Sequence, residues 1–136
     1  MSDKELSTIK TTLINHAIYF LENIGEFYPF GIALLENNEI IYHGVIDEDL
    51  VSEPTSELLI DRVSNKLFYY LDEKQALGIG LALNTSFTKK DSSETINTIE
   101  IRILYSEGMS YNIYIEYLLE NSIVSLLRET STPWIA

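Results

Sequence analysis

The residues most able to do chemistry in this sequence are carboxylates, and they are concentrated in one stretch. Between Lys10 and Arg62 lie ten acidic residues and no lysine or arginine. Such a density of negative charge would speed the approach of a basic partner and select it by charge complementarity. The same pattern is typical of a solvated face that keeps a protein in solution, and both interpretations remain open. The candidate partner-binding acids are Glu36, Glu39, Asp47, Glu48, Asp49, Glu53, Glu57 and Asp61.

The stretch from 47 to 57 is the predicted centre of a docking surface. Its carboxylates must then be exposed, close together and without lysine or arginine partners within the protein. The neighbouring sequence supplies none, although the distant Lys74, Lys89, Lys90 or Arg128 could fold over them.

Tyrosines are a second candidate for an interface, because a tyrosine offers a large contact area at a small entropy cost. The chain has nine, and those expected to be partly exposed are Tyr28, Tyr42, Tyr69, Tyr114 and Tyr117. Tyrosine is equally a normal strand residue. Tyr114, on the polar face of its strand, is therefore added to the acidic residues as a candidate partner-binding residue.

Metal and cofactor sites are not predicted. His16 and His43 lie far apart without an H-E-x-x-H motif, and the chain has no cysteine. The triplet at 47–49 lacks the D-x-D-x-D-G order of a calcium loop. Gly78-Ile79-Gly80 lacks the third glycine of a dinucleotide-binding turn and falls within a strand pattern, where close packing explains it better.

No catalytic residues are predicted either. The chain has no G-x-S-x-G elbow and no cysteine nucleophile. Carboxylates are abundant, but an acid–base pair needs surroundings that separate the two pKa values, and a sequence cannot show those surroundings.

Length and composition indicate a single domain over residues 1–136. The chain is 46% hydrophobic, so it can bury a core. Its 21 acidic and 9 basic residues give a formal charge of −12, which argues against binding to nucleic acid or to an anionic membrane. No apolar run approaches the ~20 residues of a membrane span, and the first residues lack a signal-peptide pattern. With no cysteine, these features predict a cytoplasmic protein.

Two helices are predicted on either side of a hairpin. Ser2 and Glu5 have the spacing of a capping box, and apolar residues then recur every three or four positions, which predicts a helix over about 3 to 24. Leu59, Val63 and Leu67 share this spacing in a second helix, predicted over about 55 to 74. The residues between 47 and 56 are predicted to be a polar connection.

Six strands are predicted, two of them between the helices. The hairpin covers 27–35 and 39–46, and Pro29 should lie at a sheet edge or at the start of its strand. The strand at 77–83 alternates bulky with small residues, which indicates a central strand with something packed closely against its smooth side. Further strands are predicted over 99–105, 111–117 and 123–129.

The order α-β-β-α-β-β-β-β leaves no room for the long crossovers of a parallel sheet. It predicts an α+β fold with a mainly antiparallel sheet and two helices packed on one face. The predicted core consists of Leu13, Ala17, Phe20, Val63, Leu67, Ile79, Leu81, Ile101, Ile103, Ile113 and Ile115.

One aromatic segment carries a resemblance. Glu26-Phe27-Tyr28-Pro29-Phe30-Gly31, between a helix and an asparagine-rich turn, resembles a segment of small bacterial cytoplasmic proteins of unassigned function. The strand Ile99-Glu100-Ile101-Arg102-Ile103 before a Glu-Gly turn is similar as well. Small acidic proteins of this organisation resemble immunity proteins of bacterial toxin systems, which bind and block a partner toxin. No catalytic residues come with the resemblance.

Three function classes follow, in order of preference. The first is a non-enzymatic protein-binding domain, of the immunity type, that uses its acidic surface against a basic partner such as a toxin. The second is a structural or regulatory subunit that associates with itself, for example as a homodimer, through a strand edge or an apolar surface. The third is a carboxylate-based enzyme, which needs an enclosed pocket with at least two convergent acids.

Overall fold

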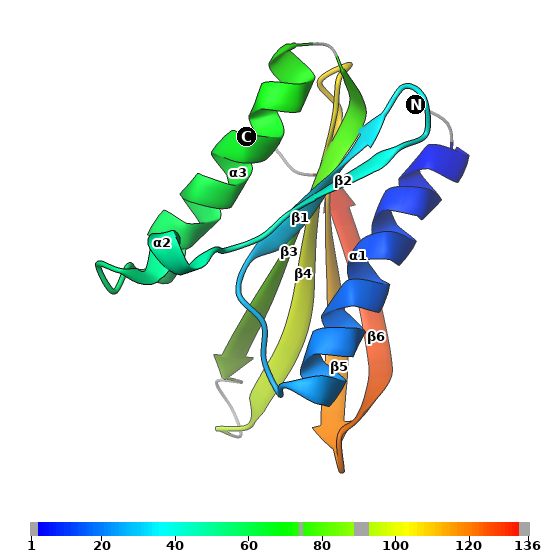
Figure 1. Cartoon of the computed structure of the whole chain (residues 1–136). Coiled ribbons are helices and arrows are strands. Elements are labelled where there is room, and N and C mark those ends of the chain that lie inside the picture. Colours follow the sequence, from blue (N-terminus) through cyan, green and yellow to red (C-terminus); the bar gives the residue numbers. More distant parts are fainter. Residues whose placement is uncertain (1–2, 74, 89–92, 134–136) are drawn as a thin grey trace.

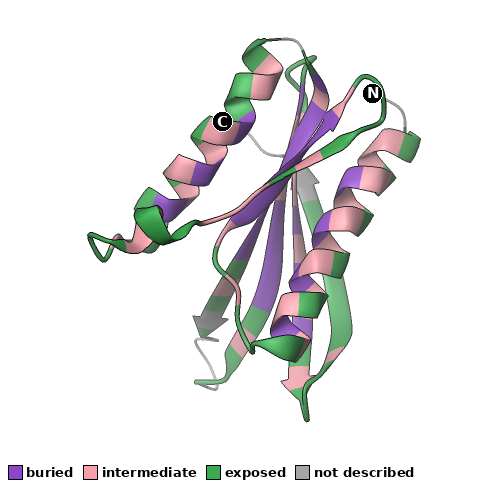
Figure 2. Ribbon diagram, in the orientation of Figure 1, coloured by how far each residue is buried: buried purple, intermediate pink, exposed green. Residues whose placement is uncertain are grey.

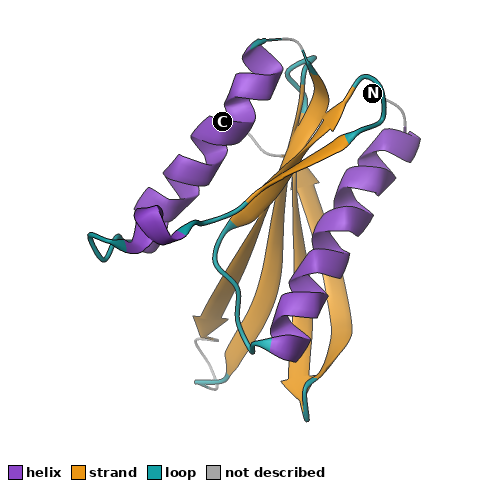
Figure 3. Ribbon diagram, in the orientation of Figure 1, coloured by secondary structure: helices purple, strands orange, loops and turns teal. Residues whose placement is uncertain are grey.

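The computed structural model describes residues 3–73, 75–88 and 93–133. Its elements in chain order are α1 (Asp3–Asn23), β1 (Phe30–Leu35), β2 (Ile40–His43), α2 (Asp47–Leu50), α3 (Ser56–Asp72), β3 (Ala76–Thr88), β4 (Thr95–Tyr105), β5 (Ser110–Glu120) and β6 (Ile123–Pro133) (Figures 1 and 3). The predicted α+β class and the order of the two long helices and six strands are confirmed. The predicted capping residue Ser2 lies outside the described residues.

The strands form one antiparallel sheet in the order β2-β1-β3-β4-β5-β6. β3 has a hydrogen-bonded neighbour on each side, as its alternating pattern predicted. β1 begins directly after Pro29, so the missing N–H of this residue takes no position in the sheet. β2 and β6 are the two edges.

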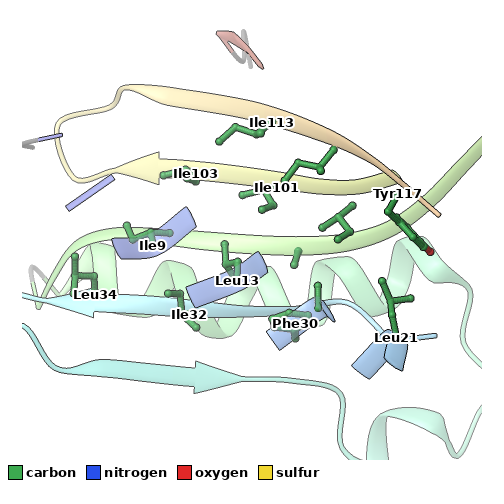
Figure 4. Close-up of a cluster of buried hydrophobic side chains, with 14 of the residues drawn as sticks. Ile9, Leu13, Leu21, Phe30, Ile32, Leu34, Ile101, Ile103, Ile113 and Tyr117 are labelled. Atoms are coloured by element: carbon green, nitrogen blue, oxygen red, sulfur yellow. The ribbon is translucent and has the colours of Figure 1, made fainter. Parts of the chain in front are cut away.

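Helix α1 covers one face of the sheet. Its buried side chains recur every four residues at Ile9, Leu13, Ala17 and Leu21. They pack against alternate residues of the strands, which point to the same face because side chains in a strand alternate. The strand residues in this cluster are Phe30, Ile32, Leu34, Ala82, Ile99, Ile101, Ile103, Tyr105, Ile113, Ile115 and Tyr117 (Figure 4).

Helix α3 packs on the opposite face, so the prediction that both helices share one face is wrong (Figure 1). Val63 and Leu67 of α3 form a second core cluster with the residues of β1 and β3 that face this helix. These residues are Ala33, Ala76, Ile79, Leu81 and Leu83. The physical reason is that β1 and β3 are apolar on both of their faces, as strands buried on both sides are. Each face therefore needs its own helix.

Two glycines allow this close approach from both sides. A Cβ at Gly80 would lie 2.6 Å from Ile9 Cγ2 and from Leu13 Cδ1, so the smooth side of β3 is the side that α1 contacts. A Cβ at Gly31, on β1, would overlap with the Gly80 carbonyl oxygen and with Leu67 of α3. The close packing expected from the small residues of β3 is therefore present.

The predicted core is buried, except that Phe20 is only partly buried and packs at the edge of the α1 cluster (Figure 2). Helix α3 contacts β1, β2 and β3. Beyond it on the same face, β4 and β5 carry the polar residues Glu100, Arg102, Asn112 and Glu116. Glu100 and Arg102 form an ion pair there with Oε2 and Nε 2.6 Å apart. No helix among the described residues has the length and apolarity of a membrane span.

Candidate functional site

The structure separates the acidic stretch into two places. Glu36 and Glu39 lie in and beside the turn between β1 and β2, at one end of the hairpin. The acids at 47–49 lie in α2, which follows the other end of β2 (Figure 1). The predicted acidic residues therefore do not form one continuous surface.

The larger group lies in what we call the acidic segment, residues 46–58, which contains α2 and the first turn of α3. Asp47, Glu48, Glu53 and Glu57 are exposed in this segment. None of them makes an ion pair with another residue in the described part of the chain. The short helix α2 was predicted as irregular connection, because its four residues are too few to show a helical repeat.

Three apolar side chains are exposed among these carboxylates. Val51, directly after α2, is 83% exposed, and Ile46 and Leu58 are also exposed. The acidic segment thus combines exposed aliphatic groups with surrounding negative charge. Protein interfaces commonly have this arrangement of an apolar centre and a charged rim.

Asp49 has a different role, and the expectation that it lacks basic partners is wrong. Its carboxylate lies 3.5 Å from Lys66 Nζ and 4.0 Å from Arg62 Nη1, with only 13% of its side chain exposed. It also accepts a hydrogen bond from the backbone N–H of Ile46. This N–H, followed by the charges of Lys66 and Arg62, holds the pKa of Asp49 below its ordinary value. Asp49 therefore ties α2 to α3 instead of facing a partner.

These partners could not be predicted because they reach Asp49 only where α2 folds back on α3. Lys66 lies one helical turn after Arg62 on α3, so both bases share a face of the helix that turns toward α2.

Asp61 is exposed on the same helix, a short distance after the acidic segment. The distant bases Lys74, Lys89 and Lys90 lie outside the described residues.

Tyr114 is not part of this surface. It is half-buried on β5, where it pairs in register with Glu100 of β4 and Thr130 of β6. Its hydroxyl oxygen accepts a hydrogen bond of 3.2 Å from Asn112 Nδ2. Helix α3 covers β1 and β3 on this face, so Tyr114 belongs to the uncovered polar part of the sheet.

Sequence reasoning missed a pocket between the end of α1, the following loop and β2. The hollow has a volume of about 410 Å³, within the range of ligand sites. We call it the aromatic pocket, and its lining residues are Phe20, Ile24, Glu26, Phe27, Tyr28, Pro29, Tyr42, Val45 and Asn84.

The buried ring of Phe30 organises the aromatic pocket. Phe20 and Phe27 meet this ring edge to face, each with a centroid separation of 5.5 Å. Tyr42 stacks on it at 5.7 Å and also contacts the ring of His16. Partial burial raises the pKa of the Tyr42 hydroxyl.

The aromatic pocket has one carboxylate, that of Glu26, among its described lining residues. The described lining therefore lacks the second convergent carboxylate that a carboxylate-based enzyme requires. In the described part of the chain, no three histidine or acidic side chains converge to hold a metal ion. Tyr28 and Tyr42 were singled out in the sequence, but their convergence depends on the pairing of β1 with β2.

No protein family, no curated protein and no solved structure matches this chain.

Proposed function

We propose that this protein is a non-enzymatic binding domain that uses the acidic segment against a basic protein partner. The observation that supports the proposal best is the exposure of Val51 and its apolar neighbours among carboxylates without internal ion pairs. Exposed apolar groups supply contact area, while the surrounding carboxylates supply selection by charge.

Asp49 supports the same proposal in another way. By anchoring α2 to α3 through Arg62 and Lys66, it holds the neighbouring carboxylates in a fixed arrangement before a partner arrives. A surface fixed in advance loses less conformational entropy on binding.

The proposed role is that of an immunity-type inhibitor, acting in the cytoplasm, which binds a basic toxin and blocks its surface. Such a role needs complementarity of shape and charge and no catalytic group. The formal charge of −12 favours rapid association with a basic protein at low ionic strength.

The test uses an octalysine peptide as the basic probe. We expect the triple variant Asp47→Asn, Glu48→Gln, Glu53→Gln to bind it about tenfold more weakly than the unchanged protein at low salt, since each exposed charge pair contributes about 0.2–1 kcal/mol. A control variant, Asp72→Asn, Glu73→Gln, Glu120→Gln, removes three exposed acids elsewhere and has the same net charge. Fluorescence anisotropy of labelled peptide measures both.

Equal weakening in the two triple variants would contradict the proposal, because binding would then follow net charge and not position. Circular dichroism of both variants checks that folding is intact.

A second candidate function is self-association through β6. This strand is a sheet edge of eleven residues, and Ile123, Leu126 and Leu127 are exposed on it. Unpaired edges readily add a strand from another chain. If this is the function, the mass measured by light scattering should rise with concentration, and Leu127→Lys should abolish the rise. A constant monomer mass would exclude it.

A further inference from the structure

The aromatic pocket has the chemistry of a cation site. Ring faces carry partial negative charge, and organic cations bind over them when they lie within about 6 Å of the centroids. Four of its lining side chains are aromatic, namely Phe20, Phe27, Tyr28 and Tyr42. Glu26 adds a full negative charge at the same hollow, and it is exposed.

The end of α1 adds to this negative potential. The carboxyl end of a helix carries a partial negative charge, which proteins usually offset with lysine or arginine in the last turn. The last turn of α1 has no basic residue. Glu22 in that turn accepts a hydrogen bond from the backbone N–H of Val124 on β6 and is not a lining residue of the pocket. Phe20, in that turn, and Ile24, just after it, line the pocket, so the carboxyl end of α1 lies beside it without a basic side chain.

The aromatic pocket also adjoins the acidic segment. Val45 lines the pocket, and Ile46 directly after it begins the acidic segment. The pocket and the acidic segment are therefore adjacent along the chain. A shallower hollow beside it, lined by His16 and Tyr19, shares Phe20 and Tyr42, which leaves room for the stem of a long side chain.

We infer that the aromatic pocket binds the guanidinium group of an arginine side chain of the partner, stacked on Tyr42 and paired with Glu26. Arginine fits better than lysine because its planar group stacks on rings while it donates hydrogen bonds to a carboxylate. The inference rests on the proposed function, because the partner protein supplies the arginine. The pocket chemistry can be tested without any partner.

The probes are N-acetyl-arginine amide and its neutral isostere N-acetyl-citrulline amide, followed by NMR of the aromatic and backbone signals. We expect the arginine compound to give saturable shifts at Phe20, Phe27 and Tyr42, and the citrulline compound to bind at least fivefold more weakly. Tyr42→Leu and Glu26→Gln should each weaken arginine binding about threefold or more. Tyr69→Leu, which removes an exposed ring on α3 outside the pocket, should leave it unchanged.

Three results would overturn the inference: equal binding of citrulline, shifts confined to the acidic segment, or no saturable shift at the pocket. The acidic-segment triple variant separates this inference from the proposed function. If arginine binding at the pocket persists while octalysine binding does not depend on the acidic segment, the proposed function fails and the pocket assignment stands.

Discussion

The ring of Tyr42 lies over the backbone of Gly44, so that a Cβ built on Gly44 would stand 2.8 Å from the Tyr42 hydroxyl oxygen. This contact is tighter than atoms tolerate, and only a glycine lets the ring keep its place. Tyr42 is 44% exposed, so its ring has room to move away. The identity of residue 44 therefore controls the shape of the aromatic pocket.

Gly44→Ala should displace the Tyr42 ring while changing the free energy of unfolding by less than about 1 kcal/mol, since a partly exposed side chain relaxes at small cost. The ring signals of Tyr42 should shift, and arginine amide should bind more weakly. Unchanged ring signals would show that Gly44 does not support the pocket.

Glycines 31 and 80 lead to a prediction about stability. A Cβ at Gly80 meets the flexible side chains of Ile9 and Leu13, whereas a Cβ at Gly31 meets the Gly80 backbone oxygen. Gly80→Ala should lower the free energy of unfolding by about 1–3 kcal/mol. Gly31→Ala should lower it further, because backbone atoms cannot move away as a flexible side chain can. Urea unfolding measures both, and the reverse order would mean that the sheet yields more easily than α1.

The two-sided core predicts additive truncations. Leu67 is buried on the α3 face and Ile101 on the α1 face, and each should lose about 2–5 kcal/mol of unfolding free energy on change to alanine. Because the sheet separates them, the double variant should show the sum within about 0.5 kcal/mol. A coupling above about 1 kcal/mol would argue against separate clusters.

Tyr105 should make the fold sensitive to high pH. Burial, followed by the charges of Tyr111 and nearby acids, raises its pKa from 10.0 to about 12. Between these values the unfolded chain has lost the proton that the folded chain keeps, so stability should fall as pH rises from 10 to about 12. Thermal unfolding of Tyr105→Phe should show a shallower decline over this interval. If the two proteins show the same decline, other groups cause the loss of stability. One such group is Tyr117, because burial also raises its pKa.

The elements could be predicted from sequence because each rests on a local repeat. The spacing of Leu59, Val63 and Leu67 predicted α3, and the alternation around Gly78 and Gly80 predicted a central strand. Which face each helix covers is not local, since apolar residues on both sides of β1 permit either arrangement.

The same limit applies to the site. The exposure of Asp47 and Glu48 could be expected, but the pairing of Asp49 with Lys66 depends on how α2 folds back on α3. The aromatic pocket depends on Tyr42 reaching Phe30 across the β1–β2 pair. The dense run of aromatic residues after Gly25 was the one available signal.

The most direct test of the account is a map of backbone amide shifts on addition of octalysine peptide at low ionic strength. We expect the largest shifts at residues 46–58, with all of them lost in about 0.5 M salt because exposed charges are screened. Shifts spread equally over exposed acids elsewhere, such as Asp72, Glu73 and Glu120, would contradict it and reduce the acidic segment to a device for solubility.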